Sequence, residues 1–407
     1  MLDLTQIKKD FPILNKETNE RPLVFLDNAS TSQKPYSVIN AITEYYENFN
    51  ANIHRGVYSI SEKASVEYEK TRKSVKEFIN AKSVNEIIFT KNTTEAINIV
   101  AYSWATKNIE EGDEILISEF EHHANLIPWQ LVAKSNKAKL VFIPITKSFD
   151  LDYEAFEKLI NEKTKLVAIT GMSNVTGTII NLKVIKEKAQ EYNSKLLVDG
   201  AQLVAHKKVD VQSSDIDFLT FSSHKMLGAT GVGILYAKEE ILEDMPPLIY
   251  GGGIVKEVTK QDSSFQNSPT KFEAGTPNIA DIIAFQEALK YLSNIGLDKI
   301  EKHEKELYEY AYSKLINIDG LKLYCPANFD IASGIISFTI DGVHPHDIAE
   351  VMNNYNVCIR AGHHCNQPLM NIFNVSATAR MSFYLYNTKN DIDTAIKAIN
   401  KCIEIFK

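Results

Sequence analysis

The residues of this sequence that could carry chemistry gather where strand-like runs end. The apolar run KLLVD ends in Asp199, and the run DFLTFS leads into His224 and Lys225. Ligands of open α/β sheets bind beyond the carboxyl ends of the strands, so this carboxylate and this amine could converge there. Such a pair is either a structural ion pair or the core of a pyridoxal phosphate site. In a pyridoxal phosphate site the lysine forms the Schiff base and the aspartate keeps the pyridine nitrogen protonated, so that the ring acts as an electron sink.

A third segment favours the cofactor interpretation. The run EIIFT leads into Thr93 and Thr94 and then into a helical pattern. Hydroxyls and free N–H groups at the start of a helix bind phosphate well, although the same residues also make an ordinary N-cap. Together with Asp199 and Lys225, this segment supplies the third anchor that a phosphorylated cofactor needs. The glycines of GATGVG (228–233) lead into a strand rather than a helix, which argues against a dinucleotide-binding loop.

Cys365 stands in a polar segment, directly after His363 and His364. An alternative is that His363, His364 and Cys365 belong to a metal site completed by His344 and His346, although no second pair of ligands has zinc-like spacing. We favour a nucleophile, because neighbouring imidazoles and arginines stabilise the thiolate, which is the reactive form. The other cysteines lie in apolar or strand-like surroundings, which are typical of inert core cysteines: Cys325, Cys358 and Cys402. No C-x-x-C pair occurs, and a disulfide framework is not expected.

Arg360 and Arg380 lie in the largely apolar segments VCIR and ATARMSFYLY. Such surroundings predict that both arginines are buried. A buried arginine needs an anion, so each is expected to meet either an Asp or Glu side chain or the carboxylate of a substrate.

Alternating strand and helix patterns predict a large α/β domain with a mostly parallel sheet that is buried on both faces. Strands are expected at 86–90, 113–118, 139–145, 164–170, 195–199, 217–222 and 231–237, and an amphipathic helix at 61–81. Later, helices are expected at 279–296, 297–318, 346–355 and 390–406, and strands at 321–324, 334–340, 357–360 and 377–386. We predict an N-terminal segment (1–20) that packs with the small domain, a large cofactor-binding domain (21–292) and a small C-terminal α+β domain (293–407) that carries Cys365.

Composition and charge narrow the class of partner. The chain has 407 residues, 44% of them hydrophobic, and 44 Lys and Arg against 52 Asp and Glu give a net charge of -8. A phosphate-tracking surface would need a basic excess, so we expect no nucleic acid partner. The first residues lack the apolar core of a signal peptide, and the longest uncharged stretches (166–182 and 361–379) are rich in polar residues, so no membrane association is expected. A cytoplasmic protein is therefore predicted.

Several motifs together resemble the class V aminotransferase family, and more narrowly its group II, Suf-type cysteine desulfurases. They are D-G-A-Q (199–202), S-x-H-K (222–225), E-H-H-A-N (121–125), F-E-A-G-T-P-N (272–278) and R-x-G-H-H-C (360–365). The likeness extends over essentially the whole chain, from DFPIL (10–14) and LDNAS (26–30) onward. Asn92 and Ser223 stand where many relatives carry glycine. The resemblance implies fold type I of the pyridoxal phosphate-dependent transferases and a homodimer.

The resemblance also implies a role for individual residues. Lys225 would be the Schiff-base lysine, Asp199 the partner of the pyridinium nitrogen and Gln202 a contact of the ring oxygen. His122 would stack on the ring, whereas the residues alone are more typical of a core histidine. The phosphate would be held by Thr93, Thr94, Ser222 and His224, joined by Thr276 of the other subunit. Arg380, assisted by Arg360 and Asn174, would bind the substrate carboxylate, since arginine suits bidentate recognition. The catalytic residues would be Lys225, His122 and Cys365, with no metal.

The reaction implied is the conversion of L-cysteine to L-alanine, with the sulfur left as a persulfide on Cys365. Both Lys225 and Cys365 would act as covalent catalysts. A sulfur-acceptor protein of the Suf-type system would then receive the sulfur for iron–sulfur cluster assembly. Two alternatives are a selenocysteine lyase, which shares these anchors, and a non-catalytic scaffold that delivers sulfur.

Overall fold

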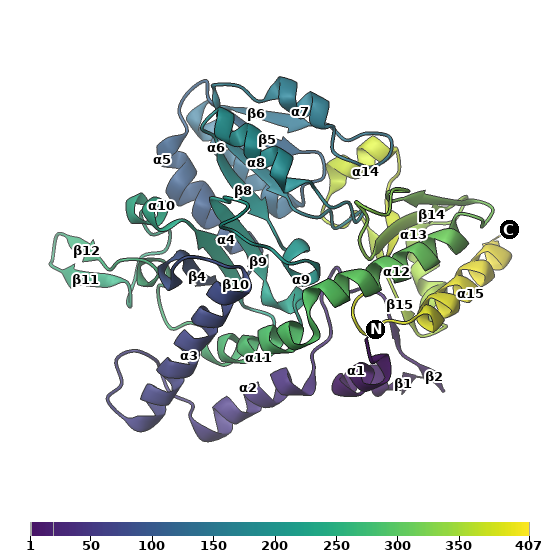
Figure 1. Ribbon diagram of the computed structural model, residues 1–407, viewed down its shortest axis with the longest axis horizontal. Helices are drawn as coiled ribbons and strands as arrows, with labels where there is room; N and C mark the ends of the chain where they lie inside the picture. The colour runs from purple at the N-terminus through teal and green to yellow at the C-terminus, as the bar shows by residue number, and fades with distance from the viewer. Residues whose placement is uncertain (1, 19, 407) are drawn as a thin grey trace.

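A seven-stranded sheet forms the centre of the computed structural model, which describes residues 2–18 and 20–406 (Figure 1). Its strands, in spatial order, are β4 (Ile87–Thr90), β10 (Gly233–Ala237), β9 (Phe218–Ser222), β8 (Lys195–Asp199), β7 (Thr164–Thr170), β5 (Glu114–Ser118) and β6 (Lys139–Ile143). β10 runs antiparallel to β4 and β9, while β9, β8, β7, β5 and β6 are parallel. The predicted mostly parallel sheet is therefore confirmed, with every predicted strand of the large domain in it.

Helices cover both faces of this sheet, which explains the continuous apolar runs of its strands. Along β4, Ile87 and Phe89 belong to one buried cluster and Ile88 to the other. The first cluster includes residues of α2 (Tyr36–Asn48), α3 (Ser59–Phe78), α7 (Tyr153–Leu159), α8 (Leu182–Glu191), α9 (Leu203–His206) and α11 (Ile279–Ile295). The second includes residues of α4 (Thr93–Ile99), α6 (Ile127–Asn136) and α10 (Glu239–Asp244). α4 continues through a π-helical turn (Val100–Ala105) into α5 (Thr106–Asn108).

The C-terminal part folds around a second sheet, of four antiparallel strands, as predicted for a smaller α+β domain. In spatial order these are β13 (Leu321–Tyr324), β14 (Ile335–Ile340), β17 (Thr378–Ser382) and β16 (Arg360–Gly362). Three helices share a buried cluster with this sheet: α12 (Leu297–Leu315), α13 (Pro345–Asn353) and α15 (Lys389–Phe406). Gly296 separates α11 from α12 with φ at +91°, a conformation that glycine adopts without a steric cost.

Two of the C-terminal strand predictions are wrong in extent. The segment VCIR forms two short strands: β15 (Val357–Cys358) pairs with β3 (Val24–Phe25), and β16 begins at Arg360 and pairs with β17. β17 ends at Ser382, and the apolar residues after it pack into the core without strand pairing. A short helix, α14 (Gln367–Phe373), follows Cys365 and was not predicted.

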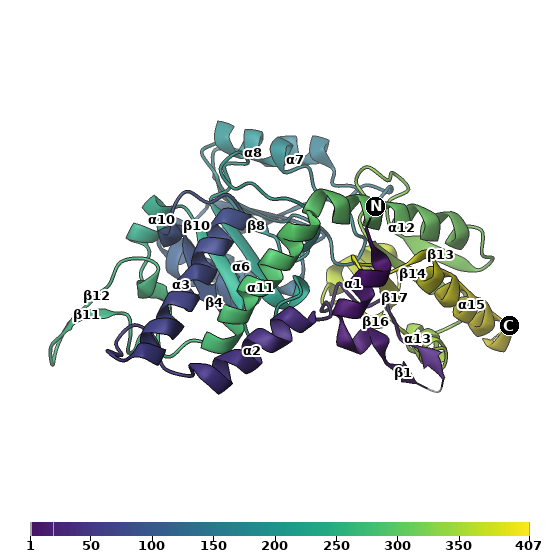
Figure 2. The ribbon, with the colours of Figure 1, turned by 60° about the horizontal axis from the view of Figure 1, so that its bottom comes forward.

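The remaining elements lie at the edges of the molecule (Figure 2). α1 (Leu4–Asp10) contacts the C-terminal part through an ion pair of 3.1 Å between Lys8 Nζ and Asp391 Oδ1. Two hairpins complete the fold: β1 (Glu17–Thr18) with β2 (Arg21–Pro22), and β11 (Val255–Val258) with β12 (Ser263–Phe265), which projects from the body in both views. The division at residues 20 and 292 stays a prediction. No helix in the described part of the chain is long and apolar enough to cross a membrane.

Candidate active site

The carboxyl ends of β8 and β9 open onto a cavity of about 330 Å³ that the small sheet helps to close. Predicted residues from both sheets line it. They are Thr93, Thr94, His122, Asn174, Asp199, Gln202, Ser222, His224, Lys225, Arg360, Cys365 and Arg380. Thr276 is the predicted site residue that does not line this cavity.

Asp199 and Lys225 lie on neighbouring strand ends of this cavity. Asp199 is the last residue of β8, is buried, and accepts a hydrogen bond of 3.0 Å from the Ala201 N–H through Oδ1. Burial raises the pKa of Asp199, and the Ala201 N–H and the charge of Lys225 oppose this shift. Lys225 ends the turn that follows β9. Burial lowers the pKa of Lys225 to about 8, and Asp199 opposes this shift. About a tenth of the lysine is therefore a neutral amine at pH 7, able to accept a proton, which is far more than for an ordinary lysine.

Hydroxyl groups gather at the start of α4. The backbone N–H of Thr93 donates to Ser222 Oγ at 2.8 Å, and the Oγ atoms of the two residues are 2.6 Å apart. Asn92 adopts an extended backbone (φ −173°) and caps α4 by accepting a hydrogen bond of 2.9 Å from the Glu95 N–H. A Cβ at Gly233 would lie 2.5 Å from the Asn92 backbone, so β10 needs glycine where it meets this helix start.

Thr94 and His224 complete this corner of the cavity. Thr94 is exposed, and His224 Nδ1 lies 3.2 Å from Thr31 Oγ1. Burial lowers the pKa of His224 to about 4, assisted by the charges of Lys225 and Lys34. Neutral hydroxyls, an imidazole and the N-terminal end of a helical segment therefore meet here, which suits an anionic group.

His122 stands opposite on the turn after β5. Its Nδ1 accepts a hydrogen bond of 3.0 Å from the Ala124 N–H, so the neutral ring carries its proton on Nε2. Burial lowers the pKa of His122 to about 3, and the charge of Lys225 adds to this shift. His122 is thus held neutral and in one orientation beside the cavity.

Gln202 leaves a buried polar atom without a partner. Its Nε2 donates to the Ala29 carbonyl at 2.8 Å, whereas its buried Oε1 has no hydrogen-bond partner within the described chain. Because a buried unpaired oxygen is costly, a polar molecule in the cavity would relieve it.

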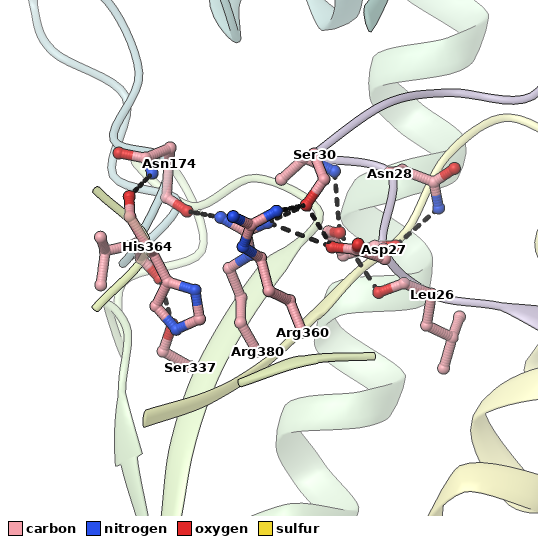
Figure 3. Close-up of polar contacts among 12 residues, drawn as sticks. Leu26, Asp27, Asn28, Ser30, Asn174, Ser337, Arg360, His364 and Arg380 are labelled. Atoms are coloured by element: carbon pink, nitrogen blue, oxygen red, sulfur yellow. Dashed lines mark hydrogen bonds and ion pairs between the residues drawn. The ribbon is translucent and has the colours of Figure 1, made fainter. Parts of the chain in front are cut away.

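The two arginines form another corner (Figure 3). Arg380 is 2% exposed; its Nη2 donates to Asp27 Oδ1 at 3.2 Å and to Ser30 Oγ at 2.9 Å, and its Nη1 donates to the Asn174 carbonyl at 2.8 Å. Arg360 Nη1 donates to Ser30 Oγ at 3.0 Å. The predicted burial is correct for Arg380 and wrong for Arg360, which is exposed because it begins the edge strand β16. Arg380 therefore meets one of the two anions that were weighed, the carboxylate of Asp27, and it also lines the cavity.

Cys365 is exposed at the rim of the cavity, between β16 and α14. The preceding His364 is buried, and its Nε2 lies 2.9 Å from Thr378 Oγ1 on β17. Asn174 Nδ2 donates to the His364 carbonyl at 2.7 Å, so this predicted substrate residue also holds the cysteine loop. The other cysteines are less exposed than Cys365, and burial raises the pKa of each of their thiols: Cys325, Cys358 and Cys402.

Thr276 is exposed and lines a separate hollow beside Gly231 and Asn278. This hollow shares Asn92 and His224 with the cavity. Within one chain Thr276 therefore lies next to the site and not in it, and its expected role across a dimer stays a prediction.

Sequence reasoning missed Asp27 and Ser30, which hold the arginines. The motif LDNAS after a short apolar run was the available signal, but nothing local relates it to residues near the other end of the chain. The metal alternative finds no support in the geometry: the described residues contain no group of three or more His, Cys, Asp or Glu side chains that could hold a metal ion. His344 instead caps α13, where its Nδ1 accepts from the His346 N–H at 3.2 Å.

Comparison with known proteins gives one consistent result. Residues 24–394 match the aminotransferase class-V family. A probable cysteine desulfurase from Staphylococcus epidermidis is 48% identical over 404 residues, which cover 99% of this chain and 98% of the relative. A solved cysteine desulfurase from Escherichia coli has a TM-score of 0.93 at 35% identity over 100% of both chains. A solved cysteine desulfurase from Thermococcus onnurineus has a TM-score of 0.95 at 35% identity over 99% of both chains.

Proposed function

We propose that this chain, which belongs to the class-V aminotransferase family, is a pyridoxal phosphate-dependent cysteine desulfurase. It converts L-cysteine to L-alanine and retains the sulfur as a persulfide on Cys365. The observation that carries this proposal is a single cavity in which an exposed thiol, a lysine with a lowered pKa and a buried arginine meet.

The residues of the cavity fit pyridoxal phosphate. Thr93, Ser222 and His224, with the helix start behind them, match a phosphate group. Asp199, at the end of the neighbouring strand β8, matches a protonated ring nitrogen, and the unpaired Gln202 Oε1 matches a polar ring substituent. Lys225 would hold the cofactor covalently through its Nζ atom, and His122 would lie against the ring. When bound, the cofactor supplies an electron sink that stabilises negative charge on the substrate.

Substrate binding follows from the arginine corner. A carboxylate is best held by a planar guanidinium in a desolvated setting, and Arg380 is buried with its Nε unpaired within the described chain. Arg360 adds a second cation from the rim. The substrate's carboxylate end is thereby fixed, which directs its thiol towards Cys365.

Proton transfer is assigned to Lys225. Its pKa of about 8 leaves part of the amine neutral, so Nζ can take the proton from the substrate α-carbon. The neutral His122 Nε2–H can hold a hydrogen-bond acceptor on the substrate without adding charge.

The sulfur step belongs to Cys365. The Cys365 thiolate attacks the substrate sulfur, a new S–S bond forms, and the Cβ–S bond of the substrate breaks. The electron pair of the broken bond ends on carbon with a proton, giving alanine. One cysteine and the enzyme thiol therefore give one alanine and the enzyme persulfide, and the reaction needs no external oxidant.

The wider setting is part of the same proposal. A homodimer would bring Thr276 of the partner subunit to the phosphate corner. A Suf-type acceptor protein would remove the sulfur from the exposed Cys365 for iron–sulfur cluster assembly in the cytoplasm.

The test is product formation by the purified protein with its cofactor. We expect stoichiometric alanine from L-cysteine in a single turnover, and continuous alanine and sulfide once a thiol reductant is added. Selenocysteine as a parallel substrate distinguishes the lyase alternative, which would turn over selenocysteine but not cysteine. If no alanine forms from cysteine either with or without the thiol reductant, the proposed function is refuted.

A further inference from the structure

Cys365 has a backbone conformation that its surroundings must impose. His364 and Cys365 have φ angles of +54° and +55°, so two consecutive non-glycine residues occupy the left-handed region. This conformation is costly for such residues and persists only where neighbouring groups hold it. Since the Cys365 side chain is exposed, packing of that side chain cannot be the support.

One support consists of the contacts of His364: Asn174 donates to the His364 carbonyl, and Thr378 lies beside the His364 imidazole. The other is the segment 120–123, on the opposite side of the loop. The His123 N–H donates to the Cys365 carbonyl at 2.8 Å, and Asn366 Nδ2 donates to the Phe120 carbonyl at 2.9 Å. Cys365 is therefore fixed from both directions.

The imidazole of His123 adds a contact that depends on its side chain. Its Nε2 accepts a hydrogen bond of 3.1 Å from the Gln367 N–H, at the first residue of α14. An accepting Nε2 requires the neutral ring with its proton on Nδ1. Burial and the nearby His363 lower the pKa of His123, in agreement with a neutral ring. His123 thus joins Cys365 and the first turn of α14 to the wall of the site.

His123 rests on a rigid base. The buried Glu121 carboxylate accepts from the Thr170 N–H at 2.9 Å and from Asn125 Nδ2 at 2.6 Å, and Asn125 Oδ1 accepts from Trp129 Nε1 at 2.8 Å. These bonds fix the turn in which the two histidines follow one another. His122 lines the cavity, while His123 does not and instead contacts the cysteine loop.

We propose that His123 is a positioning residue: its imidazole holds the start of α14 and thereby keeps Cys365 at the rim of the cavity in the orientation that attacks the substrate sulfur. This inference rests on the proposed function, because it gives Cys365 the nucleophile's role. His123 touches neither the cavity nor the thiol, so it acts on the rate of the sulfur step and not on the binding of cysteine.

The matched variants are His123→Gln and His123→Asn. Glutamine places an amide oxygen near the position of Nε2 and can accept from the Gln367 N–H, whereas asparagine is too short to reach it. We expect His123→Asn to lower kcat about two- to tenfold, as for the loss of one hydrogen bond, with an unchanged KM for cysteine. His123→Gln should keep most of the wild-type rate. Asn371→Ala, at an exposed position of α14 itself, serves as the control and should keep the wild-type rate.

A second readout is independent of activity. Hydrogen–deuterium exchange of the peptide that contains the Gln367 amide should accelerate in His123→Asn and remain slow in His123→Gln and Asn371→Ala. Equal exchange and equal kcat in the glutamine and asparagine variants would overturn the positioning role, as would a rise in KM that accounts for the whole loss. If the wild-type protein makes no alanine, the proposed function fails, and the exchange pattern still decides whether His123 holds the loop.

Discussion

Arg380 and Asp27 form an ion pair of 3.2 Å although 353 residues separate them in the sequence. The pairing is possible because residues 26–30 run beside the end of β17, where the Ser382 N–H donates to the Leu26 carbonyl at 2.7 Å. Asp27 and Ser30 thereby hold the guanidinium in one orientation. Since hydrogen bonds to Asp27 and Ser30 already fix this orientation, little side-chain entropy is lost when a carboxylate binds.

Replacement of Arg380 by lysine tests this arrangement. Lysine keeps the charge but cannot donate to Asp27, Ser30 and the Asn174 carbonyl at once, so the cation loses its fixed direction. We expect kcat/KM for cysteine to fall about 10- to 100-fold, mainly through KM, as for the loss of a charge-assisted hydrogen bond. Arg360→Lys should cost less, because Arg360 is exposed. A larger loss for Arg360→Lys would contradict the assignment of the main carboxylate site.

Lys225→Ala should lose turnover and covalent attachment of the cofactor together. Its amine lies in a turn after β9 where burial lowers its pKa to about 8, and the other cavity residues offer no second lysine. Borohydride reduction followed by peptide mass spectrometry should find the cofactor on the peptide containing Lys225 in the wild type. A reduced adduct on another lysine of the Lys225→Ala protein would show that the anchor was assigned wrongly.

Asp199→Asn should retain the cofactor and slow turnover about 10- to 100-fold. The phosphate corner is untouched in this variant, but a neutral amide no longer stabilises a positive charge at the end of β8. Absorbance of the bound cofactor after gel filtration measures retention, and the initial rate of alanine formation measures turnover. Asp298→Asn, exposed in the first turn of α12, is the control. Equal rates for both variants would make Asp199 a structural residue.

Asp199, Ser222 and Lys225 could be placed from the sequence because each follows an apolar strand run, and parallel strands deliver their carboxyl ends to the same edge. The environment of the arginines could not be predicted from the sequence. The pairing of β3 with β15, which brings Asp27 to Arg380, depends on a contact between the two ends of the chain. Apolar neighbours likewise do not show whether a strand is central or at an edge, so Arg360 was expected to be buried and is exposed.

The pH dependence of stability should reflect His224. Its pKa is lowered from an ordinary 6.5 to about 4 in the folded chain, so between these values the unfolded chain binds more protons than the folded one. The neutral His224 therefore adds to the free energy of unfolding above pH 6.5. This contribution to stability is lost as the pH falls from 6.5 towards 4.

Urea unfolding of the wild type and of His224→Gln at pH 7 and pH 5 isolates this contribution from other groups. Glu121 acts in the opposite sense in this range, since burial raises its pKa to about 8, but it is common to both proteins. We expect the wild type to lose more stability than His224→Gln on acidification. An identical loss in both proteins would mean that the pKa of His224 does not differ between the folded and the unfolded chain.

Cys365→Ser separates the cofactor chemistry from the sulfur chemistry. Lys225, Asp199 and Arg380 are unchanged in this variant, so it should bind the cofactor and cysteine as the wild type does. It should release almost no alanine from cysteine, because a serine hydroxyl stays protonated and attacks sulfur poorly, and it should be impaired less with selenocysteine, since selenium leaves with less nucleophilic help. Cys358→Ser, at a half-buried position on β15, should remain active.

The product on the protein decides which thiol accepts the sulfur. After a short exposure to cysteine without reductant, the wild type should carry an adduct of about 32 Da, one sulfur atom, on the peptide that contains Cys365. Cys325 and Cys402 are buried, which leaves Cys358 as the competitor because it is partly accessible. Because burial raises the pKa of the Cys358 thiol, the thiolate form is disfavoured there and it should stay unmodified. An adduct on Cys358, or full activity in Cys365→Ser, would refute the sulfur step while leaving the cofactor site standing.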